Sequence, residues 1–270
     1  MKPDNANHRP WVVVNMAMTA DGKIATAGRE VTTFGSPRDL KELYSLRATA
    51  DAVLCGARTV EETGATLGNG GEAFGRRRIL SGLSPMPLRV VVSGRASLNP
   101  SAAIWKEKGS PIVVLTSSEA PARARQRLES LADAVWVSPS AVLDLEAALV
   151  WIRSKWGVRR LVCEGGGGLN SAMFRSGLVD ELRVTLCPLV FGGGVSPTIA
   201  DGTPAKLADA FRLGRPEVRR HGGELYAIWK AVRAESTTSQ LRRTGSRTPE
   251  SRPKPAPPSA STKRRPGAVL

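Results

Sequence analysis

A run of four glycines directly after a short apolar segment is the part of this sequence best suited to binding an anion. Leu161–Cys163 is apolar and too short for a helix, which predicts a buried strand. Gly165–Gly168 follow closely, and Leu169–Arg175 continues at helical spacing. This arrangement directs backbone N–H groups to the carboxyl edge of a sheet, where they can hold a phosphate. Asn170 replaces the third glycine of the dinucleotide fingerprint, so a turn without a ligand stays open as an alternative.

Two charged residues follow the first predicted strand. Asp21 and Lys23 flank Gly22 in a turn after the apolar segment Trp11–Ala17. Functional residues gather at strand ends in open α/β sheets, so Asp21 and Lys23 are candidates for assisting a proton transfer. The alternative is an ordinary turn with exposed charges.

A helix is predicted to begin after Ser36. This serine can cap the helix, and Pro37 suits its first position because a proline has no N–H to leave unpaired. Asp39 stands three residues after the cap, which predicts a capping box with Ser36.

The same helix carries an arginine on its predicted buried side. Leu40, Leu43 and Tyr44 form an apolar stripe, and the next position of that stripe is Arg47. A guanidinium facing a core needs a partner, because a buried unpaired charge is costly. The partner is either a substrate phosphate, which an arginine binds with two parallel hydrogen bonds, or a carboxylate elsewhere in the chain.

Apolar strands alternate with helical stretches along the rest of the chain. This alternation predicts an α/β fold with a mostly parallel sheet and helices on both faces. His221 precedes two glycines, which predicts a hairpin turn before the last strand. The further predicted strands are Asp51–Gly56, Arg89–Val92, Ile112–Thr116, Glu181–Cys187 and Leu225–Val232, and the further predicted helices are Pro121–Leu131 and Asp144–Trp156.

The composition divides the chain into a folded part and a tail. The sequence has 270 residues, 41% of them hydrophobic, which is enough for a sizeable core. Residues 236–270 hold eight Lys or Arg, one Glu and six prolines, and they supply +7 of the net charge of +15. We predict an extension at 1–9, a domain at 10–235 and a disordered basic tail at 236–270. The tail is a candidate for contact with nucleic acid or acidic surfaces.

The amino-acid composition also argues against several classes of protein. No apolar run is long enough to cross a membrane, and the first residues have no secretory h-region. Cys55, Cys163 and Cys187 are far apart in apolar stretches, which predicts reduced thiols in a cytoplasmic protein. With two histidines and no C-x-x-C pair, no metal site is expected.

Five stretches, taken in order, resemble the reductase domain of riboflavin biosynthesis, the RibD C-terminal domain family. They are MTADGKIA at 18–25, SPRDLKELYSLRATADAVLCGARTV at 36–60, PLRVVVSG at 87–94, CEGGGGLNSAMFRSGLVDEL at 163–182 and FGGG at 191–194. The resemblance implies a dihydrofolate reductase-like three-layer sandwich with an antiparallel edge hairpin. It also implies a homodimer that uses NADPH to reduce a 5-amino-6-(5-phosphoribosylamino)pyrimidine to its ribitylamino form.

The resemblance assigns functions to individual residues. Its implied cofactor contacts are Ala17, Thr59, Ser93, Gly165, Gly166, Gly167, Gly168 and Leu169, and its implied substrate contacts are Thr33, Ser36, Arg47, Leu67 and Glu164. Glu164 is also a candidate catalytic residue, since a carboxylate beside the cofactor loop can accept hydrogen bonds. Arg58 and Arg95 are candidates for the 2′-phosphate of NADPH by their charge and their place after strands, not by the resemblance.

Two departures from the family pattern fall between the second and third strands. Thr63 and Gly64 replace a pair of aspartates, and Gly70 replaces an arginine that contacts the substrate, with Arg76–Arg78 following downstream. Either shifted residues serve instead, or the substrate differs. Two other functions stay open: a pterin or folate reductase, for which Asp39 lies near the required acidic residue, and a non-catalytic nucleotide- or nucleic-acid-binding relative.

Overall fold

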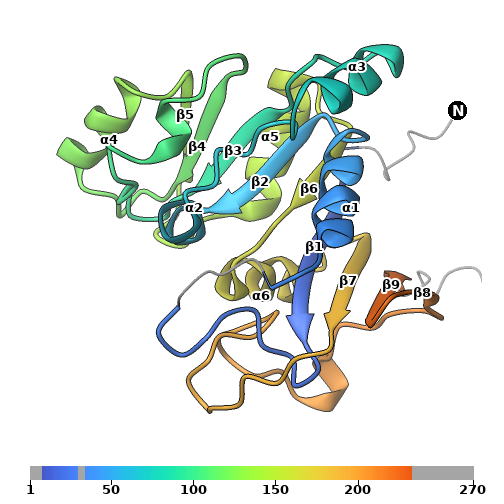
Figure 1. The fold of residues 1–270 in the computed structure, drawn as a ribbon. Helices are drawn as coiled ribbons and strands as arrows, with labels where there is room; N and C mark the ends of the chain where they lie inside the picture. The colour runs from blue at the N-terminus through green and yellow to red at the C-terminus, as the bar shows by residue number, and fades with distance from the viewer. Residues whose placement is uncertain (1–7, 30–33, 233–270) are drawn as a thin grey trace, which may run out of the picture. The chain divides into compact units, whose positions relative to one another are not determined.

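A computed structural model describes residues 8–29 and 34–232 of the chain (Figure 1). The substrate candidate Thr33 and the predicted tail at 236–270 therefore lie outside the described residues. The elements, in chain order, are β1 (Trp11–Thr19), α1 (Pro37–Arg47), β2 (Ala52–Gly56), α2 (Ala57–Thr63), α3 (Glu72–Leu80), β3 (Leu88–Val92), the 3₁₀ turn η2 (Ala103–Trp105), β4 (Ile112–Thr116), α4 (Ala122–Glu129), β5 (Ala134–Val137), α5 (Leu145–Trp156), β6 (Arg160–Cys163), α6 (Gly167–Arg175), β7 (Glu181–Cys187), the 3₁₀ turn η3 (Leu207–Asp209), β8 (Glu217–His221) and β9 (Glu224–Lys230).

The strands in the described part of the chain form one sheet in the order β5-β4-β3-β2-β6-β1-β7-β9-β8. Every neighbouring pair from β5 to β7 is parallel, whereas β9 runs antiparallel to both β7 and β8. The last two strands are joined by a turn at residues 222–223, directly after His221. The mostly parallel sheet and its antiparallel edge hairpin were both predicted, and both predictions are confirmed.

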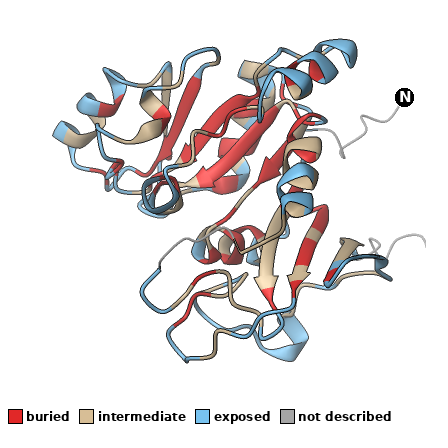
Figure 2. Ribbon diagram, in the orientation of Figure 1, coloured by how far each residue is buried: buried red, intermediate tan, exposed pale blue. Residues whose placement is uncertain are grey.

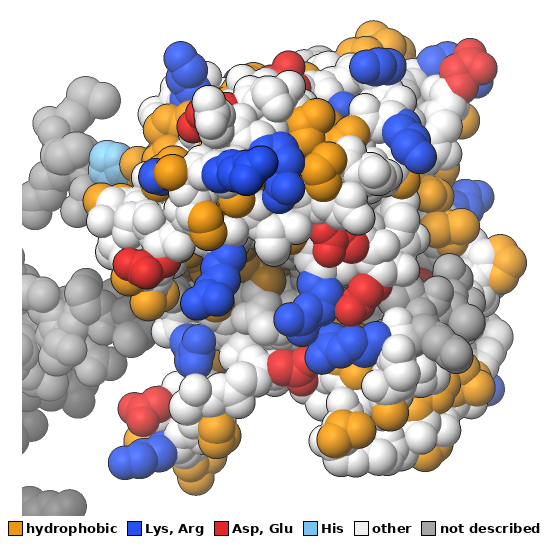
Figure 3. Space-filling view, turned by 90° about the vertical axis from the view of Figure 1, so that its left-hand side faces the viewer, with side chains coloured by type: hydrophobic (Ala, Val, Ile, Leu, Met, Phe, Trp, Pro, Cys, Tyr) orange, Lys and Arg blue, Asp and Glu red, His pale blue; other side chains and the backbone are white. Residues whose placement is uncertain are grey.

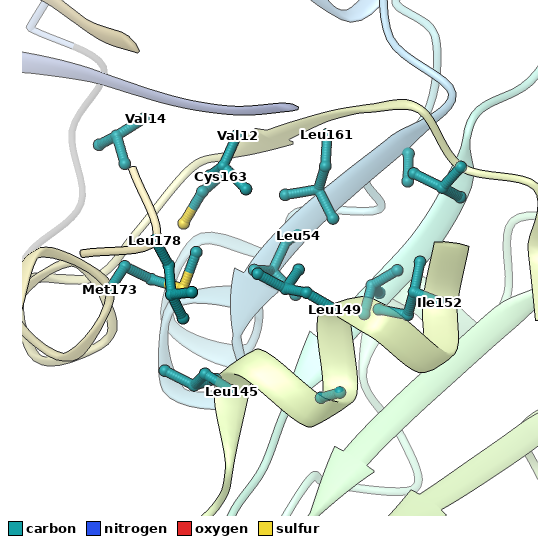
Figure 4. Close-up of a cluster of buried hydrophobic side chains, with 14 of the residues drawn as sticks. Val12, Val14, Leu54, Leu145, Leu149, Ile152, Leu161, Cys163, Met173 and Leu178 are labelled. Carbon is teal, nitrogen blue, oxygen red and sulfur yellow. The ribbon is translucent and has the colours of Figure 1, made fainter. Parts of the chain in front are cut away.

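Helices cover both faces of the sheet because neighbouring strand residues point to opposite sides. On β2, Leu54 packs with α5 and α6, while Val53 and Cys55 pack on the other side with α2 and α4. Figure 4 shows Leu145, Leu149 and Ile152 of α5 beside the strands. In Figure 2 the strands β2, β3, β4 and β6 are almost wholly buried, whereas the helices also carry exposed residues. The predicted layers are thus confirmed.

Several elements differ from the prediction. The strand β5 and the helices α2 and α3 were not predicted, and β8 was predicted only as part of a hairpin, without bounds. α2 begins directly after β2 without a loop, where the sequence predicted only residues that follow the strand. The stripe expected on α1 holds at Arg47, which is buried as predicted, but Leu46 is buried as well and Leu40 is 39% exposed.

The three cysteines are free and buried. In the ranges that the structure describes, no helix combines the length and apolar character that a bilayer span requires. Within the same ranges, no cluster of three or more His, Cys, Asp or Glu side chains is arranged to hold a metal ion.

Candidate functional site

Two adjoining cavities open where the parallel strands end. The first, the α2–α6 cavity, has a volume of about 650 Å³ and lies between the start of α2, the loop after β3 and the first turn of α6. The second, the α1 cavity, has a volume of about 310 Å³ and lies between α1, the end of β1 and Glu164. The residues that line both cavities are Arg29, Thr59, Glu62, Gly166 and Gly167. Ligands in the two cavities would therefore meet beside Thr59 and Gly166.

The glycine loop presents the start of α6 to the α2–α6 cavity. Gly166 caps α6, and the stretch from Gly166 to Leu169 lines the cavity. The first N–H groups of a helix have no partner within it, and the helix dipole is positive at this end. No atom lies within 4 Å of the place where a Cβ on Gly168 would stand. This turn is therefore accessible and can hold a phosphate group.

The neighbouring glycines are required by the packing of the protein itself. A Cβ on Gly166 would lie 2.7 Å from the hydroxyl oxygen of Thr59, which accepts a hydrogen bond of 3.1 Å from the Gly166 N–H. A Cβ on Gly167 would lie 2.5 Å from the carbonyl oxygen of Thr198. The sequence had suggested that the glycines admit a ligand; in the structure only the Gly168 position has open space.

Arg47 and Glu164 form a buried ion pair at the α1 cavity. Arg47 Nε donates to Glu164 Oε1 at 2.6 Å, and a terminal nitrogen donates to Oε2 at 2.5 Å. The other terminal nitrogen donates to the carbonyl of Gly68 at 2.7 Å. Burial lowers the pKa of Arg47, but the charge of Glu164 outweighs this and raises it overall. The carboxylate that the sequence left open as a partner is thus Glu164, 117 residues away.

The ion pair does not use the whole guanidinium of Arg47. Three of its N–H groups are engaged by Glu164 and Gly68, and a guanidinium has five. Both Arg47 and Glu164 line the α1 cavity. Two donors on Arg47 therefore remain for a ligand phosphate.

The capping box predicted at the start of α1 is wrong in one half. Ser36 accepts hydrogen bonds from the N–H groups of Arg38 and Asp39, as predicted. The reciprocal bond comes from Glu224 on β9, whose carboxylate accepts the Ser36 N–H at 2.7 Å and the Ser36 hydroxyl at 2.6 Å. The carboxyl of Asp39 is left to line the α1 cavity. Burial raises the pKa of Asp39, an interaction with Thr185 opposes that shift, and the charge of Glu224 adds to it.

Comparison with known proteins identifies the family. Residues 10–221 match the model of the RibD C-terminal domain. The chain belongs to the RibD C-terminal domain family. A 2,5-diamino-6-ribosylamino-4(3H)-pyrimidinone 5′-phosphate reductase of Archaeoglobus fulgidus is 36% identical over 194 residues, which is 72% of this chain and 87% of that protein. A reductase of the same name from Methanothermobacter thermautotrophicus is 35% identical over 208 residues, 76% of this chain and 90% of that protein.

A solved structure supports the fold of this RibD-type domain. The crystal structure of a pyrimidine reductase-like protein from Corynebacterium diphtheriae superposes with a TM-score of 0.69 at 21% identity, over 83% of this chain and 93% of that chain. At that level of identity the likeness concerns the fold alone. The resemblance noted from the sequence and the predicted fold are therefore both confirmed.

Most residues with implied cofactor contacts line a cavity of the RibD-type site. Ala17 lines the α1 cavity, Thr59 lines both, and Ser93 and Leu169 line the α2–α6 cavity. Arg58, a candidate by its charge and place, also lines the α2–α6 cavity.

Several candidates in the described residues do not line either cavity, and Gly165 of the glycine loop is one of them. Leu67 is 0% exposed and packs in the core with a φ of +59°. Ser36 is engaged in capping α1 and lies outside both linings, as does Arg95.

Asp21 and Lys23 stabilise a loop near the site. The carboxylate of Asp21 accepts hydrogen bonds from the Thr19 hydroxyl and from the N–H groups of Phe191 and Gly192. Hydrogen bonding, first from Thr19, lowers the pKa of Asp21. Lys23 donates to the carbonyl of Ser196 at 3.4 Å. Neither residue is among those lining the two cavities, and the contacts that both make are with the loop at 191–196 and with Thr19. Their function in proton transfer stays a prediction.

In the segment between β2 and β3, which departs from the family pattern, no arginine in the described residues lines the α1 cavity. Arg78 is 1% exposed and donates to the carbonyls of Arg47 and Ala50. Arg76 pairs with Glu72 on the exposed side of α3. Thr63 ends α2, where its hydroxyl donates to the Thr59 carbonyl. The basic residues lining the α1 cavity are Arg29 and Arg47, as far as the described residues extend.

Three charged or amide side chains that line the α1 cavity were not predicted from the sequence: Arg29, Glu62 and Asn15. Glu62 follows Thr59 at helical spacing and faces both cavities, but the helix that carries it, α2, was not predicted. Recognising α2 would have shown that Glu62 lies on the same side as Thr59. Arg29 and Asn15 carry no local pattern that distinguishes them.

The alternative of nucleic-acid binding has little support from the surface in view. Figure 3 shows Lys and Arg side chains interspersed with Asp, Glu and hydrophobic side chains on one side of the described molecule. A nucleic-acid interface requires basic side chains gathered on one face.

Proposed function

We propose that this chain is an NADPH-dependent reductase that converts the ribosylamino group of a phosphorylated ribosylaminopyrimidine to a ribitylamino group in riboflavin biosynthesis. The names of the two archaeal relatives support the substrate class. The observation that carries the proposal is the pair of adjoining cavities with Thr59 and Gly166 in both walls. Hydride transfer requires two ligands in contact, and this arrangement provides for that contact.

In this proposal the α2–α6 cavity holds NADPH. The N–H groups at the start of α6 bind its pyrophosphate, and the open position of Gly168 gives the phosphates room. Arg58 lines the same cavity and is the candidate for the 2′-phosphate that distinguishes NADPH from NADH.

The α1 cavity holds the substrate as its ring-opened imine. Bound NADPH supplies a hydride, which adds to the imine carbon C1′, and a proton goes to the imine nitrogen, which leaves a secondary amine. Glu164 accepts hydrogen bonds from ribose or ring donors, and Arg47 holds the Glu164 carboxylate in one orientation. The two free N–H groups of Arg47 and the guanidinium of Arg29 donate to the substrate phosphate.

The test is a stopped-flow measurement of the nicotinamide absorbance with three acceptors. These are the 2,5-diamino pyrimidinone phosphate, its deaminated counterpart and dihydrofolate. We expect NADPH to be consumed with at least one of the two pyrimidine phosphates and not with dihydrofolate. Turnover of dihydrofolate alone, or no binding of NADPH in a calorimeter, would overturn the proposal.

Assembly as a homodimer and a cytoplasmic location are further parts of the proposal. They derive from the sequence resemblance and the reduced cysteines, and a sedimentation experiment on the purified chain tests the dimer.

A further inference from the structure

Asp39 is a carboxyl of the α1 cavity that the proposed reaction leaves without a function. Its backbone N–H takes part in the cap of α1. Its carboxyl does not, because Glu224 accepts the hydrogen bond from the Ser36 N–H that a capping box would give to Asp39. The carboxyl instead packs against Gly35, where an added Cβ would lie within 2.4 Å of Asp39 Oδ2, and it lines the cavity.

No cation compensates this carboxyl in the described part of the chain. The salt bridges of α1 join Arg38 to Glu42 and Arg47 to Glu164, and neither includes Asp39. Burial raises the pKa of Asp39, a hydrogen bond from the Thr185 hydroxyl opposes that shift, and the charges of Glu224 and Glu42 add to it. Thr185 supplies one donor, whereas the two oxygens of a carboxylate can each accept more than one hydrogen bond. The half-buried carboxylate of Asp39 can therefore accept further hydrogen bonds from a ligand that carries N–H groups.

The walls around Asp39 suit a flat, polar heterocycle. Leu40 and Leu43 of α1 and Phe34 supply apolar surface to the same cavity. Asn15 of β1, which also lines it, has an amide that can donate and accept. A ligand here meets apolar side chains on its flat faces and polar groups at its rim, as is usual for a small-molecule site.

We propose that Asp39 binds the N3–H and the C2-amino group of a 2-aminopyrimidinone ring and so selects the substrate that has not been deaminated. This inference rests on the proposed function and identifies the residue that decides between its two pyrimidine substrates. The ring of the diamino compound presents two parallel N–H donors at this edge, which match the two oxygens of a carboxylate. In the deaminated ring the C2 amino group is a carbonyl, whose oxygen would face a carboxylate oxygen without a hydrogen between them.

The proposal predicts a change of preference when Asp39 becomes Asn. An amide presents one acceptor and one donor, which match the N3–H and the C2 carbonyl of the deaminated ring. For the wild-type protein we expect kcat/KM to favour the diamino substrate about 100-fold, because a site built for a hydrogen-bond donor rejects the analogue that lacks it. In Asp39→Asn we expect this ratio to fall at least about 100-fold, with turnover of the deaminated substrate rising.

The control is Glu72→Gln on α3. Glu72 is exposed, pairs with Arg76 and does not line the α1 cavity, so its loss should leave the ratio unchanged. The affinity for NADPH, measured by calorimetry, should be unaltered in both variants. If Asp39→Asn does not fold, Asp39→Ser also removes the charge, and we expect it to lower kcat/KM for the diamino substrate only.

Distinct results separate the failure of this inference from the failure of the proposed function. If the wild-type protein reduces neither pyrimidine phosphate, the proposed function fails. If it reduces one or both but Asp39→Asn lowers the two rates equally, Asp39 has only a structural role and the inference is wrong. An unchanged ratio would equally overturn it.

Discussion

The two cavities differ in the kinds of residue that their walls contain. The α2–α6 cavity has many glycine, alanine and serine residues in its walls, and it includes the first turn of α6 with its unpaired N–H groups. The α1 cavity is formed by side chains, with Arg47 and Glu164 bound to each other and Asp39 without a basic partner. Main-chain groups suit a cofactor that many enzymes share, since they bind phosphate without reading the rest of the molecule. Side chains suit a substrate that must be distinguished from close relatives.

The largest expected effect comes from breaking the ion pair of the α1 cavity. Arg47→Met leaves the buried carboxylate of Glu164 without a cation, and we expect a loss of about 3–5 kcal/mol in the free energy of unfolding. KM for the pyrimidine phosphate should also rise strongly. Urea unfolding and steady-state kinetics measure the two effects.

The double variant Arg47→Met/Glu164→Met is the control for this prediction. With both charges removed, most of the lost stability should return while activity stays low. Equal stability of the single and double variants would show that the pair is not coupled.

The next prediction concerns the α2–α6 cavity. In Gly168→Asp, a carboxylate joins the first turn of α6, where the helix dipole stabilises it. The same charge repels a pyrophosphate, so we expect NADPH to bind about tenfold more weakly while the melting temperature stays equal or rises. Calorimetry and thermal unfolding measure the two changes. Gly168→Asn is the uncharged control, and weakening of the same size there would argue against an electrostatic cause.

A smaller effect is expected where β9 caps α1. Glu224→Gln weakens the hydrogen bonds to Ser36, for which we expect about 1 kcal/mol of lost stability, typical of a helix cap. Burial raises the pKa of Glu224, but hydrogen bonds from Ser36 and Tyr226 outweigh this and lower it. A carboxyl with a lowered pKa in the folded state stabilises the protein above its unfolded pKa and loses this effect as the pH falls through the folded value. The difference between variant and wild type should therefore disappear in acid.

The smallest effect is expected at Arg58. Arg58→Ala removes an exposed cation from the α2–α6 cavity, and we expect the affinity for NADPH to fall about fivefold. The affinity for NADH should not change, because NADH has no 2′-phosphate. Equal weakening of both cofactors would place Arg58 elsewhere on the nucleotide.

The sequence predicted the sheet and its layers because each strand and helix carries its own local pattern. The buried positions of α5, Leu145, Ala148, Leu149 and Ile152, follow the expected spacing. Asp39 was assigned to a capping box because the competing residue, Glu224, lies 188 residues from Ser36. Local spacing cannot reveal such a partner.

The partner of Arg47 was undecided for the same reason, since Glu164 approaches it only when the strands pair. The short helix α2 was missed because it begins without a turn after β2, and Glu62 was missed with it. Local sequence patterns thus predicted the site residues that lie next to strands, whereas pairs of residues that meet across the sheet could be identified only from the structure.

The segment at Thr198 links the turn of Asp21 and Lys23 to the start of α6. Lys23 bridges to Thr198, and the Ile24 N–H donates to the Pro197 carbonyl at 2.9 Å. The Thr198 carbonyl in turn leaves no room for a side chain on Gly167. Lys23 and Thr198, which line neither cavity, thereby help to fix the position of the amide groups that would bind the phosphates. A substitution of Lys23 should accordingly weaken nucleotide binding and leave the chemical step itself unimpaired.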